Sequence, residues 1–484
     1  MHFSILSVRS TTRLGLRAHG ACRPACSRSS SRAKTGLAGR WVCLGGLVLS
    51  CQLLTGAGAA EATGAGASAP ARWSATDLPN RPIGQAQGIF PGRVVWVHDP
   101  QVVRWDGDPA SGGWYEDKFT DPALAEQMLS RSLRRLTGAG SDAEAWTSLL
   151  KHYNRAHGRG DVGYRPGEKI AVKLNLNCAK RAADPKHGLY NTPQLTLALL
   201  RQLVQQAQVR QEDIVVYDAS RWVNDSIFLP AHAAFPGIRF GDREGSDGRF
   251  KIEPDKRVAL HFADPELPDN GKTYLPACVT EATYLINAAV MKGHALAAVT
   301  LCAKNHFGSV YRENTGPQDP HKGWNPSHLH TPITVSTRPM GTYNALVEFM
   351  GHKDLGGKTI LYLIDALYAA QHQNERPAKW QSAPFRNHWT ASVFVSQDPV
   401  ALESVAVDLF GAEPTARLTV GAADNYLHEA ALAHQPPSGA RYDPEGDGKP
   451  LASLGVHEHW NNPQQRQYSR NLGTGPGIEL VTAP

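Results

Sequence analysis

Three consecutive segments decide the fold: KIAVKLNL at residues 169–176, NTPQLTLALLRQLVQQA at 191–207 and DIVVY at 213–217. The first and third are short apolar runs typical of buried strands. The second has a helical period, with Thr192 at the N-cap position and Pro193 as the first helical residue. A strand, a helix and a strand of these lengths predict a βαβ crossover with parallel strands. The fold class indicated is α/β, a mainly parallel sheet flanked by helices, with long irregular insertions.

The same patterns recur along the chain and predict a single α/β domain over residues 92–436. An insertion rich in Gly, Asp and Pro is expected near 221–280, and the 437–484 tail is expected to be irregular. Further strands are expected at 93–98, 284–289, 358–364 and 391–395. Further helices are expected at 121–136, 143–153, 341–350 and 400–409, with a helix or turn at 294–303.

Residues 1–60 are typical of an export leader. They hold eight basic residues and no acidic one, and the apolar run 41–54 has the length of a signal-peptide core. Small residues at 57–59 would suit cleavage, although lipid attachment at Cys51 or a retained anchor is the alternative. The Ala-, Gly- and Pro-rich segment 61–91 is expected to be a flexible linker. We therefore expect an exported protein, periplasmic or extracellular, that touches a membrane only through an uncleaved signal or a lipid anchor.

The charge balance argues against nucleic acid as a partner, and the cysteine content argues against an iron–sulfur cluster as a cofactor. The formal charge of the 484-residue chain is +6, but without the leader 42 basic residues face 44 acidic ones. This balance gives no electrostatic case for nucleic acid. Beyond the leader only Cys178, Cys278 and Cys302 remain, without a CxxC, so no iron–sulfur cluster is expected. These cysteines could form one disulfide or stay buried as thiols.

The stretch 283–308, TYLINAAVMKGHALAAVTLCAKNHFG, carries the strongest chemical signal. Two apolar runs end in Lys292-Gly-His294 and in Lys304-Asn305-His306, and packing alone does not require two Lys-x-His triplets. Two lysines could hold a carboxylate or phosphate, and the histidines could bind a metal or move protons. The alternative is that the lysines extend to the surface at element ends and the histidines cap loops.

Polar residues at predicted strand ends extend this candidate site. Lys173, Asn175 and Asn177 alternate and would share one face of a strand, which suits ligand binding or a buried hydrogen-bond network. Asp218 and Asp365 each follow an apolar strand, where a carboxylate can act as a general base or bind a cation. In open parallel sheets ligands bind beyond the carboxyl ends of the strands. Asp398 also follows a strand, but N-capping of the next helix accounts for it.

Histidines on a proline-broken segment suggest a metal site. His328 and His330, with His321 nearby, could join His294 or His306 in a site with an open position for a divalent transition metal. The alternative is that these histidines are solvated in a polar loop. No P-loop and no GxSxG motif occurs.

Several of these blocks together resemble the domain-of-unknown-function family 362. They are VKLNLN, NTPQLTLALLRQLV, VVYDAS, KGHALAAVTLCAKNHFG and SQDPVALESVAVDLF, in this order within residues 93–411. The resemblance implies no activity. Many relatives carry an added ferredoxin-like module, but this chain lacks its cysteine clusters, so that role is not carried over.

The residues support two hypotheses of different classes. The first is an exported, metal-assisted enzyme that acts on a small anionic or carbohydrate-like substrate through a Lys- and His-lined cleft. The second is a non-catalytic periplasmic or surface protein that binds a small-molecule ligand in the same cleft.

Overall fold

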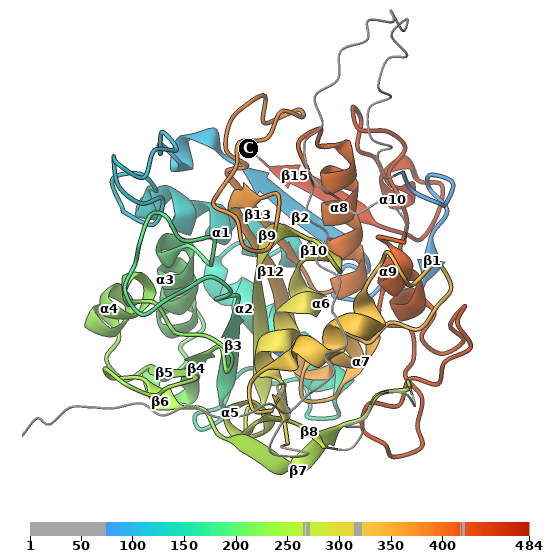
Figure 1. Ribbon diagram of the computed structural model, residues 1–484, viewed down its shortest axis with the longest axis horizontal. Coiled ribbons are helices and arrows are strands. Elements are labelled where there is room, and N and C mark those ends of the chain that lie inside the picture. The colour runs from blue at the N-terminus through green and yellow to red at the C-terminus, as the bar shows by residue number, and fades with distance from the viewer. Residues whose placement is uncertain are drawn as a thin grey trace, which may run out of the picture. The chain divides into compact units, whose positions relative to one another are not determined.

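A mixed sheet of ten strands separates two layers of helices in the described chain (Figure 1). The computed structural model describes residues 74–264, 267, 272–313, 322–416, 418 and 422–483. The predicted leader, the first part of the predicted linker and His321 lie outside these residues. Among the described helices, none combines the length and the apolar character needed to cross a lipid bilayer.

The predicted βαβ crossover is the centre of the sheet. Strands β3 (Ile170–Leu174) and β4 (Ile214–Tyr217) are parallel and are joined through α3 (Pro193–Arg201), which continues as a π-helical turn to Gln206. Strand β9 (Tyr284–His294) lies on the other side of β3, also parallel to it. The α/β fold with a mainly parallel sheet is thus confirmed.

The remaining strands extend the sheet on both sides. The full order is β15 (Glu479–Ala483), β2 (Arg93–His98), β13 (Ser392–Ser396), β12 (Thr359–Ala370), β9, β3, β4, β5 (Arg239–Asp242) and β6 (Phe250–Lys251). Strand β13 is antiparallel to both of its neighbours, and β10 (Ala298–Thr300) forms an antiparallel hairpin with β9. The other neighbouring pairs are parallel.

Side chains alternate between the two faces of the sheet, and each face contributes to a separate hydrophobic core. In β9, Leu285 and Met291 point to one face, whereas Ile286 and Val290 point to the other. One face packs against α1 (Pro122–Thr137), α2 (Asp142–Ala156), α3 and α4 (Asp225–Ala234). The opposite face packs against α6 (Cys302–Asn305), α7 (Leu346–Gly351), α8 (Pro399–Ala412) and α9 (Asn425–Ala431) (Figure 1).

Short elements complete the molecule. Strands β7 (Pro254–Leu260), β8 (Thr273–Pro276) and β11 (Tyr311–Arg312) form a small antiparallel sheet, and β1 (Ile83–Gly84) pairs with β14 (Val456–His457). Helices α5 (Ala277–Thr280) and α10 (Ser469–Leu472) are single turns. A 3-10 segment, Pro326–Ile333, carries His328 and His330.

Three sequence predictions are wrong in detail. Residues 221–280 are not wholly an insertion, because β5 and β6 lie there and belong to the main sheet. The 437–484 tail is not irregular throughout, since β15 pairs with β2 and forms one end of the sheet order. The predicted helix or turn at 294–303 contains the turn of the β9–β10 hairpin at residues 295–297 and the start of α6 at Cys302, but strand β10 between them was not predicted.

Helix caps agree with the sequence at Asp398 and differ at Thr192. The Asp398 carboxylate accepts a hydrogen bond from the Ala401 amide at 2.9 Å, as predicted for the N-cap of α8. Thr192 occupies the N-cap position of α3 but makes no capping hydrogen bond. Its hydroxyl instead donates to Asp365 Oδ2 at 2.9 Å, which holds the start of α3 against β12.

Candidate functional site

A polar pocket of about 280 Å³ lies beyond the carboxyl ends of β3 and β4, beside the β9–β10 hairpin. In open parallel sheets, ligands bind at this edge, beyond the carboxyl ends of the strands. The structure brings many of the predicted site residues to it and adds others. The pocket is lined by Asn175, Asn177, Asp218, Ser220, Arg221, His294, Leu296, Thr300, Lys304, Asn305, Phe307, Gly308, Asn325, Ser327, His330, Gln373 and Asn374.

A buried ion pair forms the floor of the pocket. Lys173 is fully buried at the end of β3, and its Nζ lies 3.0 Å from Asp218 Oδ2 and 3.1 Å from Asn305 Oδ1. Burial lowers the pKa of Lys173, and the Asp218 carboxylate opposes that shift. The other Asp218 oxygen accepts from the amide and the hydroxyl of Ser220, at 2.9 and 3.0 Å. Lys173 therefore supports the site from beneath, because it does not line the pocket.

Gly308 allows the backbone to pass close to the Lys173–Asp218 ion pair. A Cβ at Gly308 would lie 2.6 Å from Lys173 Nζ and 2.7 Å from Asp218 Oδ1, and the Gly308 carbonyl accepts from the Ala219 amide at 2.8 Å. Gly293 in the first triplet is similar, because its Cβ would lie 2.2 Å from the Gln371 carbonyl oxygen. The backbone passes too close to other groups at Gly293 and Gly308 to leave room for a Cβ, which explains why both positions are glycine.

Lys304 presents its amine to the pocket without a carboxylate partner among the described residues. Its Nζ lies 3.5 Å from the ring centroid of Phe307, a cation–π contact. Burial lowers the pKa of Lys304 well below its usual value, and the nearby charges of Arg221, Lys292 and Lys173 lower it further. The pocket therefore attracts anions, and its lysine loses a proton more easily than lysine in water.

Arg221 is the charged pocket residue that sequence reasoning missed. Its guanidinium donates to Asn177 Oδ1 from Nε at 3.1 Å and from Nη2 at 2.9 Å, and Nη1 donates to the Ser220 carbonyl at 3.0 Å. These partners are neutral, so the cation keeps its charge available to a ligand. Its position directly after Asp218-Ala-Ser220, at the end of β4, was the signal that could have found it.

His294 acts as a hydrogen-bond donor toward the pocket. Its Nδ1 accepts from the amides of Leu296 and Ala297, both at 3.1 Å, which assigns the proton to Nε2. Burial lowers the pKa of His294 strongly, so the ring is neutral. A ring in this tautomer has no free lone pair, because Nδ1 is occupied and Nε2 carries the proton.

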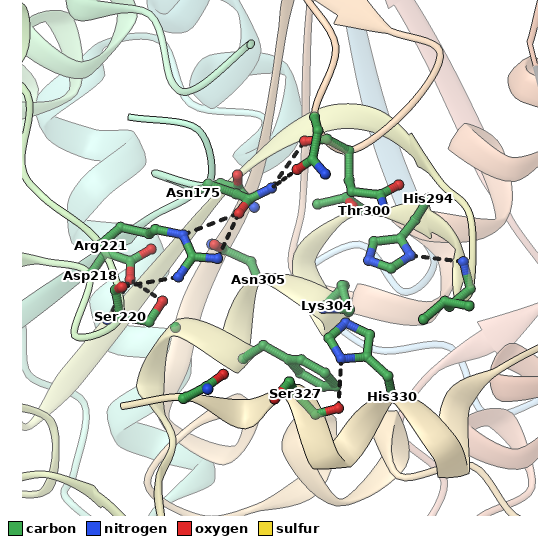
Figure 2. A pocket seen from close by; sticks show the side chains of 17 residues that line it. Asn175, Asp218, Ser220, Arg221, His294, Thr300, Lys304, Asn305, Ser327 and His330 are labelled. Carbon is green, nitrogen blue, oxygen red and sulfur yellow. Dashed lines mark hydrogen bonds between the residues drawn. The ribbon is translucent and has the colours of Figure 1, made fainter. Parts of the chain in front are cut away.

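His330 has the complementary tautomer. Its Nδ1 donates to the Ser327 carbonyl at 3.0 Å, which leaves the lone pair on Nε2. Burial lowers its pKa to about 4. Figure 2 shows His294, Lys304 and His330 together on one side of the pocket and Asp218, Ser220 and Arg221 on the other.

Two polar atoms in the pocket have no protein partner among the described residues. Asn175 Oδ1 and Thr300 Oγ1 are both buried and both belong to the lining. Buried polar atoms in native proteins are nearly always satisfied. Ligand hydroxyl groups would satisfy both atoms, so the lining suits a hydroxylated molecule.

Lys292 lies at the back of the site. It is fully buried, and its Nζ donates to the Leu189 carbonyl at 2.7 Å. Burial lowers its pKa to about 8. Lys292 does not line the pocket.

The four histidines predicted as metal ligands do not converge. His294 and His330 line the pocket with ring centroids 5.6 Å apart, whereas His306 and His328 are not part of the lining. His306 Nε2 instead accepts from Asn287 Nδ2 at 3.0 Å inside the core. Burial lowers the pKa of His306 to about 3, and its Nδ1 has no hydrogen-bond partner among the described residues.

Asp365 is also outside the pocket lining. It is buried at the end of the parallel part of β12, where Oδ2 accepts from the Thr192 amide at 2.6 Å. Burial raises its pKa to about 6. These contacts give Asp365 a structural role, since they hold the N-terminus of α3.

Two other groups of described residues could hold a metal ion. One contains Asp77, His457 and His459, and the other contains Asp424, His428 and His457. None of the five lines the pocket. Separately, Cys178, Cys278 and Cys302 are free thiols, and burial raises the pKa of Cys302, which makes it unreactive.

Residues 170–408 match the family described as domain of unknown function 362. The match confirms the resemblance inferred from the motifs, and its span contains every predicted site residue from Lys173 to Asp365. No curated protein and no solved structure matches the chain. The family description names no activity, so the chemistry has to be argued from the pocket.

Proposed function

We propose that this protein is an enzyme that moves a proton on a small, hydroxylated anion bound in the pocket. The observation that carries the proposal is Lys304, whose amine faces the pocket without a carboxylate partner among the described residues and with a lowered pKa. A volume of about 280 Å³ suits a small metabolite, smaller than a typical drug.

Binding would use Arg221, the protonated form of Lys304 and the unsatisfied polar atoms. Arg221 and Lys304 would attract a carboxylate or phosphate, and the Nε2–H of His294 would donate to one of its oxygens. Asn175 Oδ1 and Thr300 Oγ1 would accept from ligand hydroxyls. These groups favour hydroxy acids, sugar acids and sugar phosphates as a substrate class.

Proton transfer would use the fraction of complexes in which Lys304 is neutral. The C–H bond beside the substrate's acidic or carbonyl group would break, its proton would pass to Nζ, and the electron pair would delocalise onto oxygen near Arg221. The new ammonium would then return a proton to carbon. A lysine with a lowered pKa can serve as a base near neutral pH, because more of it is unprotonated.

Metal-assisted chemistry, which the sequence suggested, would have to use other ligands than His294. The Nδ1 of that ring accepts two backbone amides, so coordination through Nε2 would require the opposite tautomer. His330 Nε2 remains suited to a metal or a proton. We assign the proton step to Lys304 and also propose, from the leader at residues 1–60, that the protein acts after export.

Binding without catalysis is the second candidate. It is favoured by the same pair of cations, which would hold an anion whether or not a proton moves. Lys304→Arg separates the two, because arginine keeps the charge but stays protonated at neutral pH.

The test begins with a thermal-shift screen of hydroxy acids, sugar acids and sugar phosphates on the tag-free protein. Anions that raise the melting temperature are then incubated in D₂O with the protein and followed by proton NMR. We expect loss of one C–H signal with the wild type and none with Lys304→Arg, although that variant still binds. Exchange that persists in Lys304→Arg contradicts the base assignment, and a screen without any hit contradicts the ligand class.

A further inference from the structure

A second polar cluster lies where β1, β14, α8 and α9 meet, and none of its residues lines the pocket. His428 comes from α9, His457 from β14, and Asp424 occupies the N-cap position of α9. Asp77 reaches the cluster from the segment before β1, with its Oδ2 2.5 Å from His428 Nε2 and 3.9 Å from His457 Nε2.

The tautomer of His457 is fixed by Ser404 of α8. The Ser404 hydroxyl donates its hydrogen to the Val400 carbonyl at 2.7 Å, so it can only accept from His457 Nδ1, which lies 2.8 Å away. The lone pair of His457 is therefore on Nε2. That atom is buried and has no hydrogen-bond partner among the described residues. An imidazole held through Nδ1–H with a free Nε2 is the usual arrangement of a metal ligand.

His459 performs a different task. Its two ring nitrogens lie 2.7 Å from Asp408 Oδ1 and 3.1 Å from Asp424 Oδ2. Carboxylates therefore occupy both ring nitrogens, and His459 is an outer partner that orients Asp424.

Asp424 then offers its second oxygen to the cluster. Oδ1 is buried and has no hydrogen-bond partner among the described residues. One ligand atom from each of Asp424, His428 and His457 lies within 4.8 Å of the others. The carboxyl groups of Asp77, Asp408 and Asp424 all lie against histidines of this cluster, a set of groups that suits a divalent cation.

We propose that Asp424, His428 and His457 bind one divalent transition-metal ion, with Ser404 and His459 as the outer partners and Asp77 beside His428. Two imidazoles and one carboxylate, with water in the fourth position, suit a four-coordinate ion such as Zn²⁺. The ion would fasten α9 to β14, and it would stabilise the folded state because the unfolded chain lacks the site.

Metal titration of the whole protein tests the site directly. The tag-free protein is treated with a chelator, its folding is checked by circular dichroism, and Zn²⁺ and Co²⁺ are added. We expect one ion per chain, a higher melting temperature and the visible absorption of four-coordinate Co²⁺. Folded wild-type protein that binds neither ion overturns the proposal.

Three variants locate the ion. His457→Ala removes a ligand and should abolish stoichiometric binding, whereas His434→Ala, at an exposed histidine three residues after the end of α9, should leave it unchanged. Ser404→Ala keeps every ligand but releases the His457 tautomer, so we expect about 10- to 100-fold weaker binding. Tight binding of one ion that survives both His457→Ala and Ser404→Ala places the metal elsewhere and overturns the assignment.

Discussion

The imidazole rings of His294 and His330 stack with centroids 5.6 Å apart and planes 20° apart, yet they offer opposite hydrogen-bonding groups. His294 presents Nε2–H because its Nδ1 accepts two backbone amides. His330 presents a bare Nε2 because its Nδ1 donates to Ser327. The pocket wall thus contains a donor and an acceptor beside Lys304, and neither depends on a charged histidine.

The donor function of His294 can be separated from its structural function. Asparagine places an amide oxygen near the position of Nδ1, so His294→Asn should keep the turn at residues 295–297 and lose only the pocket donor. A hydrogen bond to a charged group is worth about 1.5–3 kcal/mol, so we expect roughly 10- to 100-fold weaker anion binding. Calorimetric titration with a hit from the screen measures it. His294→Ala should also lower the melting temperature, and equal melting temperatures for both variants would contradict this division.

Anion binding should take up protons at Lys304. In the free pocket its pKa is lowered by burial and by neighbouring cations, and a bound anion would raise it part of the way back, so that the complex holds Lys304 in both its protonated and its neutral form. Affinity should therefore fall as the pH rises above the pKa of the free protein. Titration calorimetry in buffers of different ionisation enthalpy counts the protons. Lys304→Met should remove the uptake, and identical proton counts in the variant and the wild type would exclude Lys304 as the acceptor.

The Lys173–Asp218 pair should show strong thermodynamic coupling. Removing one partner of a buried ion pair leaves an uncompensated charge and costs about 3–5 kcal/mol. We therefore expect Lys173→Met and Asp218→Asn each to be strongly destabilising, and the double variant to lose less than their sum. Urea unfolding of the four proteins measures the coupling. If the losses of unfolding free energy are additive, the 3.0 Å contact between Lys173 and Asp218 contributes no coupling energy.

Gly308→Ala should disrupt the floor of the pocket. The added Cβ would meet Lys173 Nζ and Asp218 Oδ1 at less than 3.0 Å, and overpacking of this kind typically costs about 1–3 kcal/mol. Gly163→Ala is the matched control, because a Cβ there would meet nothing within 4 Å. Urea unfolding compares the two, and an equally small effect at both positions would mean that the ion pair moves aside without cost.

His306 should make stability depend on pH. Burial lowers its pKa to about 3 in the folded protein, whereas the unfolded chain has the ordinary value of about 6.5. Between these two pKa values the unfolded state therefore binds more protons than the folded state. The stability that neutral His306 contributes to the folded state is lost as the pH falls through this window. Relative to His306→Gln, the wild type should lose up to about 1.4 kcal/mol per pH unit below pH 6.5. Urea unfolding at pH 7.5, 6.0 and 5.0 tests it, and parallel curves would contradict it.

Local signals predicted the parts of the site that belong to the βαβ unit and its neighbour. Lys173, Asn175 and Asp218 stand at the ends of β3 and β4, so strand prediction alone placed them at one edge. The same reasoning placed Asp365 there as well, but its carboxylate is turned to Thr192 and serves α3. A strand end gives the position of a residue and does not give the partner of its side chain.

The metal prediction shows the same limit for histidines. His306 follows Lys304 by two residues, yet its ring enters the core at Asn287, because the short helix α6 and the following 3-10 turn send neighbouring side chains in different directions. The cluster at His428 and His457 gave no sequence signal. Its members come from residues 77, 424, 428 and 457, which only the packing of β1, β14 and α9 brings together.

By itself the sequence determined the α/β class, the parallel pair β3 and β4, the N-cap at Asp398 and the general location of the pocket. These features depend on periodicity, helix-capping residues and strand ends, which act over a few neighbouring residues. The tertiary structure decided the place of β15 in the sheet, the cation at Arg221, the tautomers of His294 and His330, and the inward turn of His306 and Asp365. Each of these depends on which distant group a side chain meets, and burial and hydrogen bonding to that group exist only once the chain has folded.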